Sequence, residues 1–472
     1  MLKALEEKHR EMIVGLNDSL NKLTDRLNLA LSEQGKIQGE IIRDTMDNAT
    51  NQLKNLLNMR LQDIDSKVKE SLEEGFKKTN DTFDRVMKQL STIDEAQKKI
   101  DGLTSKLIGR RLGISPRSLA RELIKLLNSE TLDQNAALLL AALVRRLTDI
   151  LLAWRSDAAV HGVAIRGTNK EGPFGGFCAG GDIRFFHQAA TQGDPALEDF
   201  FTEEYALNHL IHNYAKPYIA FMDGIVMGGG MGISQGASLR VVTERTKMAM
   251  PETAIGLFPD VGGGYFLSRC PGRVGEWLAL TGDTIGAGDA IENRLADGCL
   301  PADQQAAVWE ALGTQSFASG AAVKDYVASK FVAASALQKS ARGQIDQYFS
   351  LGSVGEIVAA LEAADSDWAR ATAATLRKRS PLMLHVVLEQ IRRARDMGLA
   401  DDLRMERDMV RHCFFLRPGQ SETVEGIRAL AVDKDHAPRW NPGRIEDVTP
   451  DMVAQFFTSP WPAHAHPLAH LS

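Results

Sequence analysis

The chain has 472 residues, a length that predicts two or three domains, and its hydrophobic fraction of 44% is ordinary for a soluble globular protein. The net charge of −6 disfavours a chain that mainly coats nucleic acid. The four cysteines form no CxxC pair, and the sequence shows no signal peptide and no apolar run of membrane-spanning length, so we expect a cytoplasmic protein without disulfides or a membrane partner.

Residues 1–105 have the pattern of a long coiled-coil helix. They contain no proline, and their apolar residues recur at alternating steps of four and three. The longer of two such runs is broken only by Thr79 and comprises Leu72, Phe76, Thr79, Phe83, Val86, Leu90 and Ile93. A narrow apolar stripe must be buried against a partner, so we expect self-association, with an oligomerisation or spacer role favoured over a functional surface.

The rest of the chain is expected to form an α/β domain with a helical end. Residues 106–150 read as a helical junction, with a buried helix expected from Ala136 to Leu152. Short strands, glycine-rich turns and helices alternate through residues 151–300, beginning with an apolar strand at Val160–Ile165. Residues 301–472 are mostly helical and end in an extended, proline-rich tail.

Two glycine-rich segments resemble turns between a strand and a helix. They are FCAGGDI at 177–183 and DGIVMGGGMG at 223–232. Glycine permits close backbone approach, and the first amides of a helix have no partner within the helix. Two such turns facing one another would supply two amide donors to one oxygen, as a thioester carbonyl that gains negative charge requires. Neither segment has the sequence of a phosphate-binding GxxxxGK[ST] loop.

A third segment, MPETAIGLFPDVGGG at 250–264, places Glu252 and Asp260 between turn residues. A carboxyl group in apolar surroundings can have a raised pKa and act as base, acid or nucleophile. Two neighbouring carboxyl groups are driven towards different protonation states, which divides the acid and base roles.

The order of these motifs resembles the crotonase (enoyl-CoA hydratase/isomerase) superfamily, and within it the 3-hydroxyisobutyryl-CoA hydrolase branch, over about residues 150–472. The resemblance implies a spiral of ββα units and hydrolysis of a short 3-hydroxyacyl-CoA thioester in valine breakdown. The implied reaction requires no metal and no cofactor beyond the coenzyme A of the substrate. The residues to which it gives roles are Gly181 and Gly229 in the oxyanion hole, Glu252 and Asp260 as the catalytic pair, and Glu204, Cys178, Ala179, Gly180 and Asp182 beside the substrate. Whether Glu252 attacks the acyl carbon or activates water stays open.

Two departures bear on this resemblance. Hydratases of the superfamily carry a glutamate at the position of Gly232 in this chain. Because that carboxylate is missing here, an enoyl-CoA hydratase or isomerase is the second hypothesis, behind the hydrolase. The family normally begins with a β-hairpin and an Arg-Pro element, and Leu127–Leu143 occupy that place here without them. The first strands of the core are therefore expected to be replaced.

The N-terminal residues carry a resemblance of their own. The segments KKTNDTF at 77–83 and IDEAQKKIDGL at 93–103 are similar to the coiled coil of the DNA recombination protein RmuC. The nuclease-like domain of that family does not follow, so no nuclease role and no nucleic-acid partner are expected. The third hypothesis is a coiled-coil scaffold or DNA-associated fusion with an inert crotonase domain.

Overall fold

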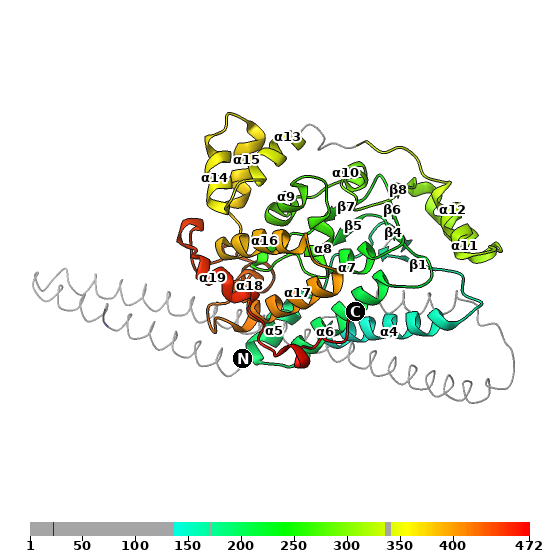
Figure 1. The fold of residues 1–472 in the computed structure, drawn as a ribbon, viewed down its shortest axis with the longest axis horizontal. Coiled ribbons are helices and arrows are strands. Elements are labelled where there is room, and N and C mark those ends of the chain that lie inside the picture. The colour runs from blue at the N-terminus through cyan, green and yellow to red at the C-terminus, as the bar shows by residue number, and fades with distance from the viewer. Residues whose placement is uncertain (1–21, 23–135, 170–171, 336–340) are drawn as a thin grey trace, which may run out of the picture. The chain divides into compact units, whose positions relative to one another are not determined.

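The computed structural model describes Lys22 and residues 136–169, 172–335 and 341–472 (Figure 1). The chain divides into two compact units, residues 1–112 and residues 113–472, and the α/β fold belongs to the second unit. The coiled coil expected at 1–105, the RmuC-like segments and the junction up to residue 135 lie outside the described residues, apart from Lys22, and stay predictions.

The main sheet has four parallel strands in the order β1-β4-β6-β8. Beside it, β5 pairs in parallel with β7, and β2 pairs antiparallel with β3. The strands are β1 Val163–Arg166, β2 Thr168–Asn169, β3 Gly172–Pro173, β4 Tyr218–Met222, β5 Ile225–Met227, β6 Leu239–Val242, β7 Lys247–Ala249 and β8 Gly298–Cys299. All five residues of β4 are buried, as expected for an inner strand of a parallel sheet covered on both faces.

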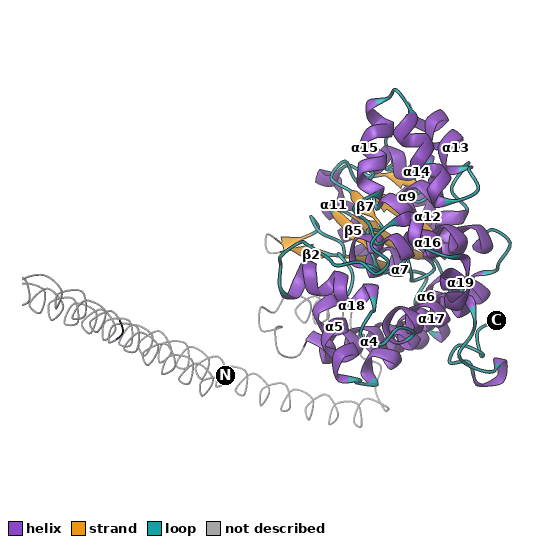
Figure 2. Ribbon diagram, turned by 90° about the vertical axis from the view of Figure 1, so that its left-hand side faces the viewer, coloured by secondary structure: helices purple, strands orange, loops and turns teal. Residues whose placement is uncertain are grey.

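Helices surround these strands, and Figure 2 shows β5 and β7 lying among them. Their bounds are α4 Ala136–Ser156, α5 Ile183–Gln192, α6 Ala196–His212, α7 Gly229–Gln235, α8 Gly263–Ser268, α9 Val274–Thr281, α10 Ala287–Glu292, α11 Gln305–Thr314, α12 Gly320–Ala328, α13 Arg342–Phe349, α14 Val354–Ala363, α15 Asp367–Leu376, α16 Pro381–Ala394, α17 Leu399–Phe415, α18 Glu422–Ile427 and α19 Pro450–Ala454. Among the described helices, none combines the length and the apolar character needed to cross a bilayer. The parallel sheet and the helical C-terminal region confirm the expected α/β class.

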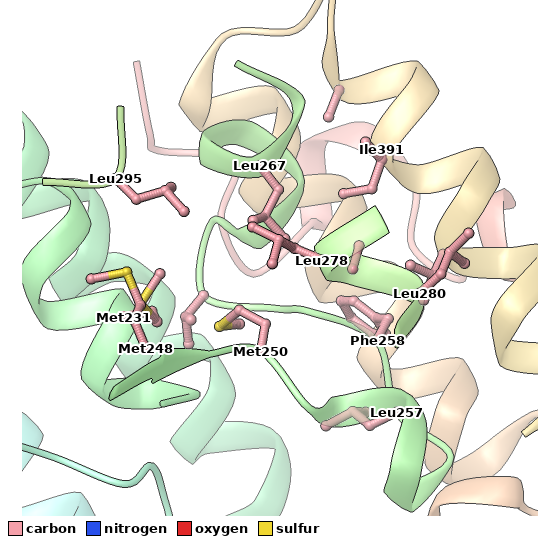
Figure 3. Close-up of a cluster of buried hydrophobic side chains, with 14 of the residues drawn as sticks. Met231, Met248, Met250, Leu257, Phe258, Leu267, Leu278, Leu280, Leu295 and Ile391 are labelled. Atoms are coloured by element: carbon pink, nitrogen blue, oxygen red, sulfur yellow. The ribbon is translucent and has the colours of Figure 1, made fainter. Parts of the chain in front are cut away.

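The hydrophobic core joins the glycine-rich half of the unit to the C-terminal helices. Figure 3 shows Met231 of α7, Met248 of β7 and Met250 near Leu267 of α8 and Ile391 of α16. These side chains are buried, and the same cluster extends through α9 and α17. Helices α16 and α17 also pack on α8, so a C-terminal segment supports the loop that carries Asp260.

Candidate active site

The first two glycine motifs lie side by side. The Cys178 amide donates to the Ile225 carbonyl at 3.0 Å, and the Met227 amide donates to the Cys178 carbonyl at 2.9 Å. These bonds continue the ladder of β5 onto residues 177–178, so the loop after Cys178 lies against the turn between β5 and α7.

The backbones of the two turns are in contact. A β-carbon added at Gly180 would lie 3.5 Å from the Gly229 nitrogen, and one added at Gly228 would lie 3.6 Å from the Gly180 α-carbon. Gly180 and Gly228 have φ values of 96° and 50°, which glycine adopts without strain. These residues, with Gly181 and Gly229, are partly exposed, so the junction of the two turns remains open to solvent.

The Gly229 amide is the first of helix α7 and therefore has no acceptor within the helix. Neither it nor the Gly181 amide donates a hydrogen bond to another described residue. Gly181 follows Gly180, the residue that contacts the second turn. Two unpaired amides near this junction are compatible with an oxyanion hole, and the convergence of Gly181 and Gly229 on one oxygen stays a prediction.

Glu252 approaches the glycine junction from one side. It begins a short 3₁₀ helix, Glu252–Ile255, after Pro251, and its side chain is 7% exposed. A β-carbon added at Gly228 would lie 3.3 Å from its Oε1, and its Oε2 has no hydrogen-bond partner among the described residues. Burial raises the pKa of Glu252 well above its usual value, and the charge on Asp260 raises it further. A buried carboxyl oxygen without a hydrogen-bond partner is costly, and a functional role is one explanation for such a group.

Glu204 approaches the junction from another side. It lies on helix α6 with its side chain buried, and a β-carbon added at Gly229 would lie 3.0 Å from its Oε1. Burial, and then the charge on Asp260, raise the pKa of Glu204 well above its usual value. The structure thus brings the predicted Glu204 and Glu252 to the same pair of glycines.

Asp260 completes a group of three buried carboxyl groups. Its Oδ2 accepts a hydrogen bond of 2.9 Å from the hydroxyl of Tyr205. Burial raises the pKa of Asp260 to about 6, and the Tyr205 hydrogen bond opposes that rise. Because like charges in a buried site disfavour one another, the charge on ionised Asp260 makes ionisation of Glu204 and of Glu252 less favourable. Such a site can hold one carboxylic acid and one carboxylate together, as acid–base chemistry requires.

The remaining predicted residues lie at the rim of the junction. Ala179 is exposed, and burial raises the pKa of the Cys178 thiol. Asp182 caps helix α5 by accepting a hydrogen bond from the Arg184 amide at 3.0 Å, so it has a structural role of its own. Contacts of these residues with coenzyme A stay a prediction. Among the described residues no group of three metal-ligating side chains could hold an ion.

Gly232 has no room for a side chain. A β-carbon there would lie 2.5 Å from Nδ2 of Asn208 and 2.7 Å from Cβ of Val261. The glutamate that hydratases carry at this position could be accommodated only if α6 or the Asp260 loop moved. A cavity of about 380 Å³ opens behind this contact, lined by Asn208, Gly232 and Val261 but by none of the three carboxyl groups.

Sequence reasoning gave Tyr205 no role and missed its hydrogen bond to Asp260. The residues are 55 positions apart, and no local spacing joins them. The available signal was the position of Tyr205 beside Glu204 on a helix whose neighbouring residues, Phe200 and Phe201, are apolar.

Partly open glycine turns beside three buried carboxyl groups, in a parallel α/β fold, define a site for acyl transfer or proton transfer. Residues 131–457 match the family model described as enoyl-CoA hydratase/isomerase, and the chain belongs to this family. That match confirms the resemblance to the crotonase superfamily for this part of the chain.

Several relatives of this chain bear the name 3-hydroxyisobutyryl-CoA hydrolase. The chain is 37% identical over 328 residues to the mitochondrial 3-hydroxyisobutyryl-CoA hydrolase of Xenopus tropicalis, covering 67% of this chain and 82% of the relative. It is also 37% identical to probable 3-hydroxyisobutyryl-CoA hydrolase 3 of Arabidopsis thaliana, covering 67% of this chain and 84% of the relative.

Two solved structures are similar over the same region. One is a carnitinyl-CoA dehydratase from Mycobacterium thermoresistibile, with a TM-score of 0.63 and 36% identity. The other is an enoyl-CoA hydratase from Rhodobacter sphaeroides 2.4.1, with a TM-score of 0.61 and 37% identity. Each match covers 68% of this chain and 90% of the other chain.

Proposed function

We propose that this chain hydrolyses the thioester of 3-hydroxyisobutyryl-CoA, or of a similar short 3-hydroxyacyl-CoA, to give the free hydroxy acid and coenzyme A. The observation that carries the proposal is the approach of Glu252 and Glu204 to the glycine pair Gly228–Gly229. The charge on Asp260 raises the pKa of both glutamates. The relatives that bear the name of this hydrolase support the choice of substrate.

The proposed reaction adds water across the thioester bond. The carbonyl oxygen would lie at the Gly181 and Gly229 amides, which stabilise the negative charge that develops on it. Glu252 in its ionised form would either remove a proton from the attacking water or attack the acyl carbon itself, and in the second case water would then cleave the mixed anhydride to release the acid and restore Glu252. The sulfur would leave as the thiol of coenzyme A after gaining a proton, which Asp260 or Glu204 in its acid form would donate.

The raised pKa of Glu252 gives this scheme a pH dependence. If the ionised form is the base or nucleophile, turnover rises as pH rises through that pKa. The direction follows because burial favours the neutral acid, which is unable to accept a proton or attack carbon.

The first experiment is thiol-release kinetics on 3-hydroxyisobutyryl-CoA with the full chain and with Glu252→Gln. The substitution retains the size of the side chain and removes its basicity, so we expect kcat to fall about 10²–10⁴-fold. Glu276→Gln is the control, since Glu276 is also buried but forms ion pairs with Arg273 and Arg395. Equal turnover by Glu252→Gln and the unaltered chain would sink this mechanism.

A second substrate separates the hydrolase from the hydratase. Incubation with crotonyl-CoA, followed by loss of the enoyl absorbance, detects hydration without thiol release. The packed position of Gly232 favours the hydrolase, because the hydratase carboxylate has no place there. Hydration faster than thioester cleavage would support the hydratase, and no turnover of either substrate would support an inert domain with a scaffold role.

Two further expectations belong to this proposal. We propose that residues 1–105 mediate self-association, which sedimentation of the full chain at several concentrations tests. We also propose a cytoplasmic location, while several relatives are named mitochondrial. Imaging of the tagged chain in its own cells distinguishes the two compartments.

A further inference from the structure

Helix α17 places two acidic residues on its buried face. Asp402 and Glu406 are four residues apart, share that face with Leu403 and Met409, and have side chains that are fully buried. Burial raises the pKa of both groups, and each lies near the other. Buried carboxyl groups on an apolar face are costly, and their partners indicate what they do.

Their partners are the first amides of helix α8. Glu406 accepts hydrogen bonds from the Gly262 amide at 2.7 Å and the Gly264 amide at 2.8 Å, one to each oxygen. Asp402 accepts from the Tyr265 amide at 2.9 Å. Three amides that follow Asp260 are thus held by one distant helix.

Helix α16 holds the other side of the same loop. The Nε2 of Gln390 donates to the Pro259 carbonyl at 2.7 Å and to Oε1 of Glu406 at 3.1 Å. Hydrogen bonds from two C-terminal helices therefore fix the backbone both before and after Asp260.

The loop between these anchors has a backbone that resists relaxation. Val261, directly after Asp260, has a φ of 56°, a left-handed conformation that is strained for a β-branched residue. Such a conformation persists only where its surroundings enforce it. The enforced segment is the one that aims the Asp260 carboxyl group at Tyr205.

We infer that Glu406, with Asp402 and Gln390, forms a positioning clamp that holds the Asp260 loop in the geometry required for thioester hydrolysis. This inference rests on the proposed function. The clamp residues bind the backbone of the loop, so they are positioning residues and not catalytic ones. The ionisable groups near the clamp are Tyr205 on α6, Asp260 on the loop and Arg269 after α8.

The test compares Glu406→Gln with the unaltered full chain. The new amide nitrogen would face one of the two loop amides, donor against donor, so the loop loses part of its support. Displacement of a reacting group by about 1 Å can cost roughly 100-fold in rate, so we expect kcat to fall about 10- to 100-fold. Because binding groups elsewhere are untouched, KM should stay within about twofold of the unaltered value on the same reasoning.

Glu276→Gln is the matched control. Glu276 is also fully buried, but it pairs with Arg273 at 2.9 Å and Arg395 at 2.6 Å and holds no atom of the Asp260 loop. Loss of a buried carboxylate lowers thermal stability in both variants, but only Glu406→Gln should lower kcat in the folded protein.

Gln390→Met is a milder variant for the case in which Glu406→Gln does not fold. It removes the bond to Pro259 and leaves Glu406 on its two amides, so we expect a smaller loss of kcat at unchanged KM. Thiol release by the unaltered chain is measured first, because its absence overturns the proposed function and not the clamp. Two results with an active unaltered chain would overturn the clamp. The first is full kcat in both Gln390→Met and Glu406→Gln. The second is a fall in kcat that is no larger in these variants than in Glu276→Gln.

Discussion

Two opposing influences set the charge on Asp260. Burial favours the neutral acid and raises its pKa to about 6, while the Tyr205 hydroxyl donates to the carboxylate and favours the ionised form. Because the folded-state pKa lies above the ordinary value of 3.8, the folded protein binds this proton more tightly than the unfolded chain does. Asp260 therefore reduces stability progressively as pH rises from about 4 to about 6, a reduction fully present above that range.

Tyr205→Phe should raise the pKa of Asp260 further. The variant keeps the ring in its buried place but removes the hydrogen bond from the Tyr205 hydroxyl to Oδ2 of Asp260. In the pH profile of kcat/KM for thiol release, the limb that belongs to Asp260 should therefore move to higher pH.

The control compares the pH profile of kcat/KM for Tyr205→Phe with the profile for Tyr218→Phe. Tyr218, on strand β4, is also buried, but its hydroxyl has no hydrogen-bond partner among the described residues and does not bond to Asp260. A limb that stays in place in Tyr205→Phe, or moves to lower pH, would contradict this account of the charge on Asp260.

At the scale of elements, the site depends on how closely α6 and α7 approach. Gly232 on α7 faces Asn208 on α6, one turn after Glu204, and Val261, which follows Asp260. One small residue therefore sets the distance between the helix that carries Glu204 and the loop that carries Asp260. The same contact excludes the side chain that the hydratase hypothesis needs.

Gly232→Ala should disturb both stability and catalysis. Its methyl group would meet Asn208 and Val261 at less than 3 Å, and overpacking of this kind costs about 1–3 kcal/mol. We expect a lower Tm and a lower kcat, because the Asp260 loop is displaced with Val261. The same substitution at Gly343 on α13, where a β-carbon meets nothing, should be neutral or stabilising. Equal Tm and kcat in the two variants would show that Asn208 and Val261 can move apart to make room for a methyl group at Gly232.

The elements show how far the sequence could predict the site. Glycine turns and the Glu252–Asp260 segment are local motifs, so the α/β class and the two turns could be predicted from the sequence pattern. The roles of Gly229 and Glu204 came from the resemblance to the crotonase superfamily. The clamp could not be predicted, because Glu406 lies 144 residues after Gly262 and its partners are backbone amides. Every residue except proline has such an amide, so the sequence does not indicate which ones are bound. The clamp's one signal is that Asp402 and Glu406 fall on the apolar face of α17.

At the scale of the whole molecule, helix α4 supports the site from the N-terminal side. The Tyr214 hydroxyl donates to the Leu151 carbonyl at 2.7 Å, and Lys216 Nζ donates to the Trp154 carbonyl at 2.5 Å. Arg145 forms a 2.8 Å ion pair with Glu203, beside Glu204. Helix α4 therefore packs on α6, the helix that presents Glu204 and Tyr205, although it precedes the first strand.

Two deletions test this arrangement. Residues 113–472 contain every residue of the candidate site, so we expect this piece to release thiol with the kcat and KM of the full chain. A start at residue 157 removes α4 with buried Val144, Ile150 and Leu151, at about 1.5–3 kcal/mol each. That loss approaches the total stability of a typical domain, about 5–15 kcal/mol, so we expect no cooperative thermal transition and no turnover. A folded, active piece beginning at residue 157 would show that the strands and C-terminal helices hold α6 without α4.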